Sequence, residues 1–307
     1  MVRDKPDLQV KIRELVLKNP VLTASGTFGY GRELASLVDP VRLGAVIVKG
    51  ISLQSRAGNP PPRIVETPCG MLNAIGLENI GVEKFINEKL PFLRESGACV
   101  IVNILGDSVE EYGQLAEILD NVPGIHAVEV NISCPNVKQG GVAFGIDPEA
   151  ARRVTAEVRK KCRLPVIIKL SPNVTDITSI ARAAEDGGAD AVSLINTIQG
   201  MAIDIQTRRP RLANVIGGLS GPAIKPVAVR MVWQTTNAVS IPVMGIGGIT
   251  TPGDALEFLI AGASAVQIGT GNFINPKATI HVLEGIEKYL LEHEMNSIHE
   301  LIGSLND

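Results

Sequence analysis

The sequence alternates between short apolar runs and longer amphipathic segments. Eight apolar runs have the length and continuous apolar character of strands that are buried on both faces. They occupy residues 21–25, 45–49, 99–104, 127–132, 165–170, 191–196, 242–246 and 265–269. Because amphipathic helical segments separate most of these runs, the pattern predicts parallel strands joined by crossover helices.

Two of the intervening segments carry recognisable helix boundaries. In residues 175–188, Thr175 or Asp176 suits the N-cap of a helix that ends at Gly187. In residues 251–262, Pro252 suits a first helical turn and Gly262 suits a helix end. Imperfect alternation over residues 8–18 predicts a short hairpin before the main fold.

Eight strands that alternate with helices favour one fold class, a (β/α)8 TIM barrel. The alternative is an open doubly wound sheet. That alternative fits less well, because the turn after the first strand reads SGTFGYG and lacks the G-x-G-x-x-G dinucleotide fingerprint. No linker interrupts the pattern, so we expect a single domain over residues 1–307.

Three connections are longer than a plain barrel unit requires. They span residues 50–99, 136–148 and 197–220. All three leave the carboxyl ends of strands, where barrel active sites are built. Since long connections in a compact domain are usually functional, we expect these to be loops that cover the mouth of the barrel.

Composition and charge narrow the classes of function. The chain has 307 residues, of which 45% are hydrophobic and 20% charged, so it can bury a sizeable core. A net charge of −3 and an aromatic content of 3% argue against nucleic-acid binding, which needs a basic surface and stacking rings. No segment has the apolar length of a signal peptide or a membrane span. We therefore expect a soluble, cytoplasmic protein.

The four cysteines lack metal-ligand spacing, so no metal site is expected. Cys99 and Cys162 lie just before apolar strands and are expected to be core or structural residues, and Cys69 is given no role. Cys134 differs, because it follows a buried strand and lies beside amides and a hydroxyl in NISCPN. The alternative for Cys134 is an inert buried thiol. We favour a functional thiol, because the seven other strands also end in polar or glycine residues.

Polar and glycine residues follow the strands at one predicted rim. In chain order they are Ser25, Lys49, Asn103, Asn131, Lys169, Asn196 with Thr197, Gly247 with Gly248, and Gly269 with Thr270. Lys49 and Lys169 each end an aliphatic run. Each could bind a ligand in the predicted mouth, or its ammonium could simply extend to solvent. No acidic residue ends a strand beside them, so we expect an anionic ligand such as a phosphate, a carboxylate or a reduced cofactor.

The last two strand ends predict a phosphate site. Residues 245–250 (GIGGIT) and 267–272 (QIGTGN) place glycine backbone after the seventh and eighth strands, which is a recurring phosphate site in barrels. The alternative is that these glycines only allow the chain to turn and bind no phosphate. A phosphate-bearing cofactor over the mouth follows, and flavin mononucleotide (FMN) is one candidate. Asn103, Asn131 and Asn196 offer both donors and acceptors to a ring with alternating amide groups.

Nine motifs together resemble the dihydroorotate dehydrogenases. They are VLTASGTFG, VIVKG, MLNAIGLEN, NISCPNVKQGG, IIKLSPN, LINT, GGLSGPAIKP, GIGGI and QIGTG. They fall in the family order over nearly the whole chain, and they are most similar to the FMN-binding catalytic subunit of the type 1B enzymes. This resemblance implies oxidation of dihydroorotate to orotate in pyrimidine biosynthesis.

The resemblance also implies a set of contact residues. Those matching flavin contacts are Ser25, Lys49, Gly50, Asn103, Asn131, Lys169, Ile195, Gly221, Gly247, Gly248, Gly269 and Thr270. Those matching pyrimidine contacts are Lys49, Asn73, Ala74, Ile75, Gly76, Leu77, Asn131, Asn196 and Thr197. Cys134 matches the catalytic base, which would take a proton from the substrate while FMN takes a hydride.

The resemblance further implies a partner. NAD would be the final acceptor, yet the chain has no dinucleotide fingerprint and no cysteine cluster for an iron–sulfur centre. A second subunit carrying FAD and a 2Fe–2S cluster is therefore expected, around a core homodimer of this chain in a heterotetramer. The alternatives are a type 1A homodimer that uses fumarate, a phosphate-binding barrel lyase or aldolase using Lys169, and a non-catalytic ligand-binding barrel.

Overall fold

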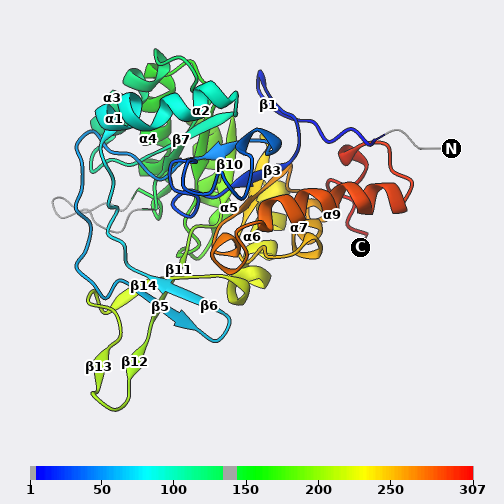
Figure 1. Ribbon diagram of the computed structural model, residues 1–307. Helices are drawn as coiled ribbons and strands as arrows, with labels where there is room; N and C mark the ends of the chain where they lie inside the picture. The colour runs from blue at the N-terminus through cyan, green and yellow to red at the C-terminus, as the bar shows by residue number, and fades with distance from the viewer. Residues whose placement is uncertain (1–4, 134–143, 307) are drawn as a thin grey trace.

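The computed structural model describes residues 5–133 and 144–306, and its centre is a parallel eight-stranded sheet (Figure 1). The strand order is β3-β16-β15-β10-β9-β8-β7-β4. A parallel bridge between Leu22 and Ala45 brings the two end strands together, so that the sheet is a nearly closed barrel. The TIM-barrel prediction is confirmed, and the open doubly wound sheet is not what forms.

The eight barrel strands coincide with the eight apolar runs of the sequence. All their residues except Asn131 are buried, because helices cover the outside of the sheet and side chains fill its inside. The strands are β3 (Val21–Thr23), β4 (Val46–Ile47), β7 (Val100–Ile104), β8 (Ala127–Asn131), β9 (Val166–Lys169), β10 (Ala191–Leu194), β15 (Val243–Ile246) and β16 (Ala265–Ile268).

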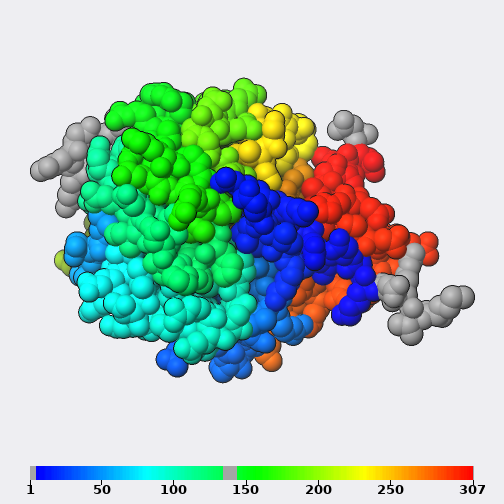
Figure 2. Space-filling view, turned by 90° about the horizontal axis from the view of Figure 1, so that it is seen from above, coloured from blue at the N-terminus to red at the C-terminus, as the bar shows by residue number. Residues whose placement is uncertain are grey.

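Helices surround the barrel in chain order. Figure 2 shows this as a succession of colours around the molecule, from cyan through green and yellow to red. The α-helices are α1 (Val82–Lys84), α2 (Leu90–Ser96), α3 (Val109–Asp120), α4 (Pro148–Lys161), α5 (Ile177–Asp186), α6 (Lys225–Thr236), α7 (Pro252–Ile260), α8 (Gly271–Ile274) and α9 (Ala278–Glu292). Three 3₁₀ segments are η1 (Pro40–Arg42), η3 (Pro222–Ile224) and η4 (Ile298–Glu300), and one π-helical segment is η2 (Phe85–Lys89).

The helix boundaries read from the sequence hold in the structure. Asp176 is the N-cap of α5, and its carboxylate accepts from the backbone N–H of Thr178. Gly187 is the C-cap of the same helix. Pro252 is the first residue of α7, and Gly262 follows its C-cap with a φ of +108°.

The predicted N-terminal hairpin is also confirmed. Strands β1 (Val10–Ile12) and β2 (Leu15–Leu17) pair antiparallel. Arg13 at its turn donates to the carbonyl of Arg163, just before β9. The hairpin therefore lies at the amino ends of the barrel strands, opposite the mouth.

Two of the three long connections lie at the mouth, as predicted, but they form a second sheet there and are not plain loops. Strands β5 (Ile64–Thr67), β6 (Gly70–Asn73), β11 (Ile198–Met201) and β14 (Ile216–Ser220) pair antiparallel in the order β11-β14-β6-β5. A further pair, β12 (Ile203–Asp204) and β13 (Arg209–Pro210), extends from it. Figure 1 shows both at one end of the molecule, away from β1.

Part of the third connection lies outside the described residues. Residues 134–143, which include Cys134 and most of the connection over residues 136–148, are among those that the structure does not describe. Within residues 5–133 and 144–306, no helix combines the length and the apolar character that crossing a bilayer requires.

Candidate functional site

A cavity of about 1030 Å³ lies at the mouth of the barrel. Its lining draws on the carboxyl ends of all eight barrel strands and on the second sheet. Every predicted flavin and pyrimidine contact residue lies in the described chain and lines this cavity, from Ser25 after β3 to Thr270 after β16. The structure therefore brings together residues that are spread over most of the sequence.

Glycines shape one side of the cavity. Gly247 and Gly248 follow β15 with φ values of +132° and +76°, which side chains rarely adopt. A Cβ on Gly248 would lie 2.8 Å from the Cβ of Lys225 and 2.9 Å from the carbonyl oxygen of Gly221. The turn thus packs against the segment that opens helix α6, and both segments face the cavity.

A partly buried carboxylate fixes this turn. Asp254 in α7 accepts from the backbone N–H groups of Thr250 and Thr251, at 3.0 and 2.8 Å, and from the ammonium of Lys225 at 2.8 Å. Burial alone would raise the pKa of the Asp254 carboxyl. Hydrogen bonds from Lys225, Thr250 and Thr251 outweigh it and hold that pKa well below its usual range.

The second polar feature is Lys169, whose predicted surroundings need correction. No acidic residue ends a strand beside it, but Glu129, in the middle of β8, places its Oε1 3.6 Å from the Lys169 ammonium. The ammonium also donates to the hydroxyl of Ser25 at 3.1 Å. Glu129 belongs to an apolar-looking run and points into the barrel because alternate residues of β8 do so. Lys169 is therefore held by the protein before any ligand binds.

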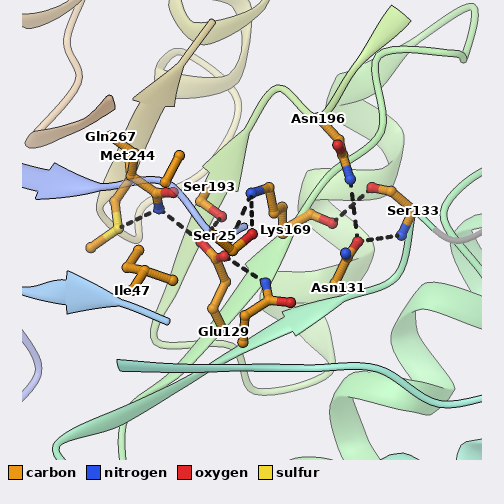
Figure 3. Close-up of polar contacts among 12 residues, drawn as sticks. Ser25, Ile47, Glu129, Asn131, Ser133, Lys169, Ser193, Asn196, Met244 and Gln267 are labelled. Atoms are coloured by element: carbon orange, nitrogen blue, oxygen red, sulfur yellow. Dashed lines mark hydrogen bonds and ion pairs between the residues drawn. The ribbon is translucent and has the colours of Figure 1, made fainter. Parts of the chain in front are cut away.

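Glu129 is the centre of a polar network beneath the cavity. Its carboxylate accepts from the amide of Asn103 at 2.7 Å, from the amide of Gln267 at 2.7 Å and from the hydroxyl of Ser193 at 2.9 Å. Figure 3 shows Lys169, Ser193 and Gln267 turned toward this carboxylate. The network draws on five barrel strands, β7, β8, β9, β10 and β16.

A second group of amides lies beside this network. Oδ1 of Asn131 accepts from the backbone N–H of Ser133 at 3.2 Å and from the side-chain amide of Asn196 at 3.3 Å (Figure 3). The backbone N–H of Thr197 in turn donates to Asn196 at 2.8 Å. These contacts fix the orientation of two amides that line the cavity.

Two further lining residues have features that suit a ligand site. Lys49 is half-buried and pairs with no acidic side chain among the described residues. Leu77 has a φ of +58°, a strained conformation of the kind that clusters at ligand sites. The rim thus offers a cation for an anionic group.

Sequence reasoning missed several polar lining residues. Ser171 and Asn173 follow β9, Ser220 ends β14, and all three line the cavity. Their positions after or at the end of strands were the available signal. Glu129, beneath the cavity, also had a signal, since it is the only charged residue in its apolar run.

Two cysteines outside the site, Cys99 and Cys162, are poor candidates for reactive thiolates. Burial raises the pKa of Cys99 to about 12 and that of Cys162 to about 11. Both follow the prediction that they are structural. In the described chain, no group of three or more His, Cys, Asp or Glu side chains could hold a metal ion.

The residues present fit FMN. The glycine turns present backbone without side chains to the cavity, as a phosphate requires for close approach. Oδ1 of Asn103 is buried and has no hydrogen-bond partner among the described residues, so an acceptor remains for a ligand N–H. Lys169 supplies a cation at the cavity floor. These groups match the phosphate, the amide edge and the developing charge of a flavin.

Comparison with known proteins identifies the family of this chain. The sequence profile of the dihydroorotate dehydrogenase family matches residues 7–290. The chain is 60% identical over 301 residues to a protein of Geotalea uraniireducens (strain Rf4), which covers 98% of this chain and 99% of the relative. It is 58% identical over 299 residues to one of Thermoanaerobacter sp. (strain X514), which covers 97% and 99%.

Both relatives bear the same name, dihydroorotate dehydrogenase B (NAD(+)), catalytic subunit. A protein of Geotalea daltonii with that name is 60% identical over 98% of this chain. Because the family profile matches most of the sequence and these identities extend over nearly the full length, the chain belongs to the dihydroorotate dehydrogenase family.

Proposed function

We propose that this chain is the FMN-binding catalytic subunit of an NAD-linked dihydroorotate dehydrogenase, which oxidises dihydroorotate to orotate. One observation carries the proposal: a single cavity at the barrel mouth is lined by glycine turns, two lysines and an array of amides. The names of the relatives support it.

The cofactor would lie across the mouth of the barrel. Gly221, Gly247, Gly248, Gly269 and Thr270 would hold its phosphate through their backbone. Its ring would meet Ser25, Asn103 and Lys169 at the floor, together with Lys49, Gly50, Asn131 and Ile195. When bound, FMN supplies the hydride acceptor.

The substrate would lie above the ring, beside Lys49. The half-buried ammonium of Lys49 would bind the substrate carboxylate. Asn131, Asn196 and Thr197 would bind the pyrimidine amides, with residues 73–77 closing the other side. Cys134, outside the described residues, would accept the proton as the general base.

The remaining parts of the proposal concern assembly and location. The partner subunit would carry FAD and a 2Fe–2S cluster, and two copies of each chain would form a heterotetramer around a homodimer of this one. That residues 1–307 form a single domain and that the protein is cytoplasmic also remain predictions.

Anaerobic flavin reduction tests the function. The purified chain should be yellow, and its flavin should bleach when dihydroorotate is added. Cys134→Ala should slow this reduction by about 10²–10⁴-fold, the effect typical of removing a general base, while orotate binding is kept. Cys69→Ala, at an exposed cysteine, is the matched control and should reduce its flavin at the wild-type rate.

Two results would count against the proposal. A colourless protein that cannot be loaded with FMN would refute the cofactor. A Cys134→Ala variant that is reduced at the wild-type rate would place the base elsewhere.

A further inference from the structure

Glu129 is a charged side chain in the least accessible part of the molecule. It is 0% exposed, and it does not line the cavity but lies beneath it. A buried carboxylate is unfavourable unless it is paired and hydrogen-bonded. Its network, which draws on five strands, meets this requirement. A buried carboxylate is thus held below the position proposed for the flavin ring.

The two carboxylate oxygens have different partners. Oε1 faces the cavity side of the network, where it accepts from Asn103 and lies near the ammonium of Lys169. Oε2 accepts from Ser193 and Gln267, both of which are 0% exposed. One oxygen therefore contacts two lining residues, and the other contacts only the barrel interior.

The contact with Asn103 decides which end of its amide is free. A carboxylate is only an acceptor, so Asn103 must turn its NH₂ group toward Glu129. Its Oδ1 is then left buried without a partner among the described residues. The floor of the cavity thus offers an acceptor at Asn103 beside a cation at Lys169.

We propose that Glu129 is the positioning residue of this site, which fixes the amide orientation of Asn103 and holds the ammonium of Lys169 beneath the flavin ring. It acts through these two side chains and does not touch the ligand. The inference rests on the proposed function in that FMN is the ligand whose binding and reduction are measured.

The reduction potential of bound FMN separates this role from two others. Negative charge develops on the flavin during reduction, and a cation beneath it makes reduction easier. If Glu129 holds that cation in place, its removal lowers the potential. If Glu129 acted only as a nearby anion, its removal would raise the potential, and a purely structural role would leave the potential unchanged.

The test variant is Glu129→Gln, which keeps the shape and removes the charge. Asn103 and Gln267 each have an unpartnered amide oxygen, so whichever of the two faces the new NH₂ group can turn to accept from it. We therefore expect the apoprotein to fold, which thermal unfolding checks. FMN affinity should fall about 10- to 100-fold, the equivalent of losing one hydrogen bond to a charged group, and the reduction potential should fall.

Ser193→Ala is the matched control. It removes a donor from Oε2 but leaves the contacts of Oε1 with Asn103 and Lys169, so FMN affinity and potential should stay close to wild type. An unchanged or raised potential in Glu129→Gln would overturn the inference. If the wild-type protein binds no FMN, the proposed function itself is wrong. If the wild type binds FMN but the potential of Glu129→Gln does not fall, only the role of Glu129 is wrong.

A second comparison applies even if Glu129→Gln does not fold. Lys169→Met and the double variant Lys169→Met/Glu129→Gln should have similar FMN potentials, because Glu129 would have no ammonium left to hold and only its contact with Asn103 would be lost. A higher potential in the double variant would show a direct effect of the carboxylate and overturn the inference.

Discussion

Gly269 tests the proposed phosphate site at the scale of one residue. Its backbone lies outside the positive-φ region, and an added Cβ would lie 3.4 Å from the Cβ of Ala24, an ordinary contact. Gly269→Ala should therefore fold while placing a methyl group in the cavity. FMN binding should weaken by roughly 1–3 kcal/mol, the usual effect of overpacking, as measured by titrating apoprotein with FMN.

The control is another glycine with room for a methyl group. A Cβ on Gly253 in α7 would meet only Thr251 Oγ1, at 3.8 Å, and Gly253 does not line the cavity. Gly253→Ala should keep wild-type FMN affinity. If Gly269→Ala bound FMN with full affinity, the phosphate could not lie against the backbone after β16 as proposed. Gly248 is a poorer probe, because substitution there strains the backbone itself.

At the scale of elements, Asp254 connects helix α7 to the glycine turn and to the start of α6. Its pKa lies below the unfolded value of about 3.9. The unfolded chain therefore binds more protons between the two pKa values, and stability rises with pH there. The contribution of Asp254 is complete above about pH 4 and is lost as the pH falls through the folded pKa.

Asp254→Asn should accordingly destabilise the protein at neutral pH. We expect a decrease of about 1–3 kcal/mol in the free energy of unfolding, because several hydrogen bonds to a charged group are weakened. The difference from wild type should shrink below about pH 4, as measured by denaturant unfolding across pH. Glu257→Gln, which removes a more exposed partner of Lys225, should have a smaller effect. A difference that is constant with pH would contradict the assigned pKa shift.

The elements differ in how far the sequence predicts them. The barrel strands were predictable because complete burial leaves a continuous apolar run. The second sheet was not, since β14 reads IGGLS and pairs with β6 across 145 residues, Gly218 with Asn73. Such pairing leaves no local signal. The partners of Glu129 were hidden for the same reason, because they come from four other strands that only barrel closure brings together.

At the scale of the whole molecule, the remaining question is where the electrons go. The relatives are named as NAD-linked catalytic subunits, which implies that they work with another subunit. The mouth cavity is lined by the predicted flavin and pyrimidine contacts, and the sequence has no dinucleotide fingerprint elsewhere. We therefore expect that this chain alone cannot pass electrons to NAD.

The purified chain, loaded with FMN, should oxidise dihydroorotate when an artificial dye is the acceptor. Its NAD reduction should be negligible and should return when the iron–sulfur flavoprotein subunit is added. Dye reduction in the same preparation is the control, because it shows that the flavin site is intact. Robust NAD reduction by the isolated chain would remove the need for a partner, and brisk turnover with fumarate would instead indicate a self-sufficient homodimer of the type 1A kind.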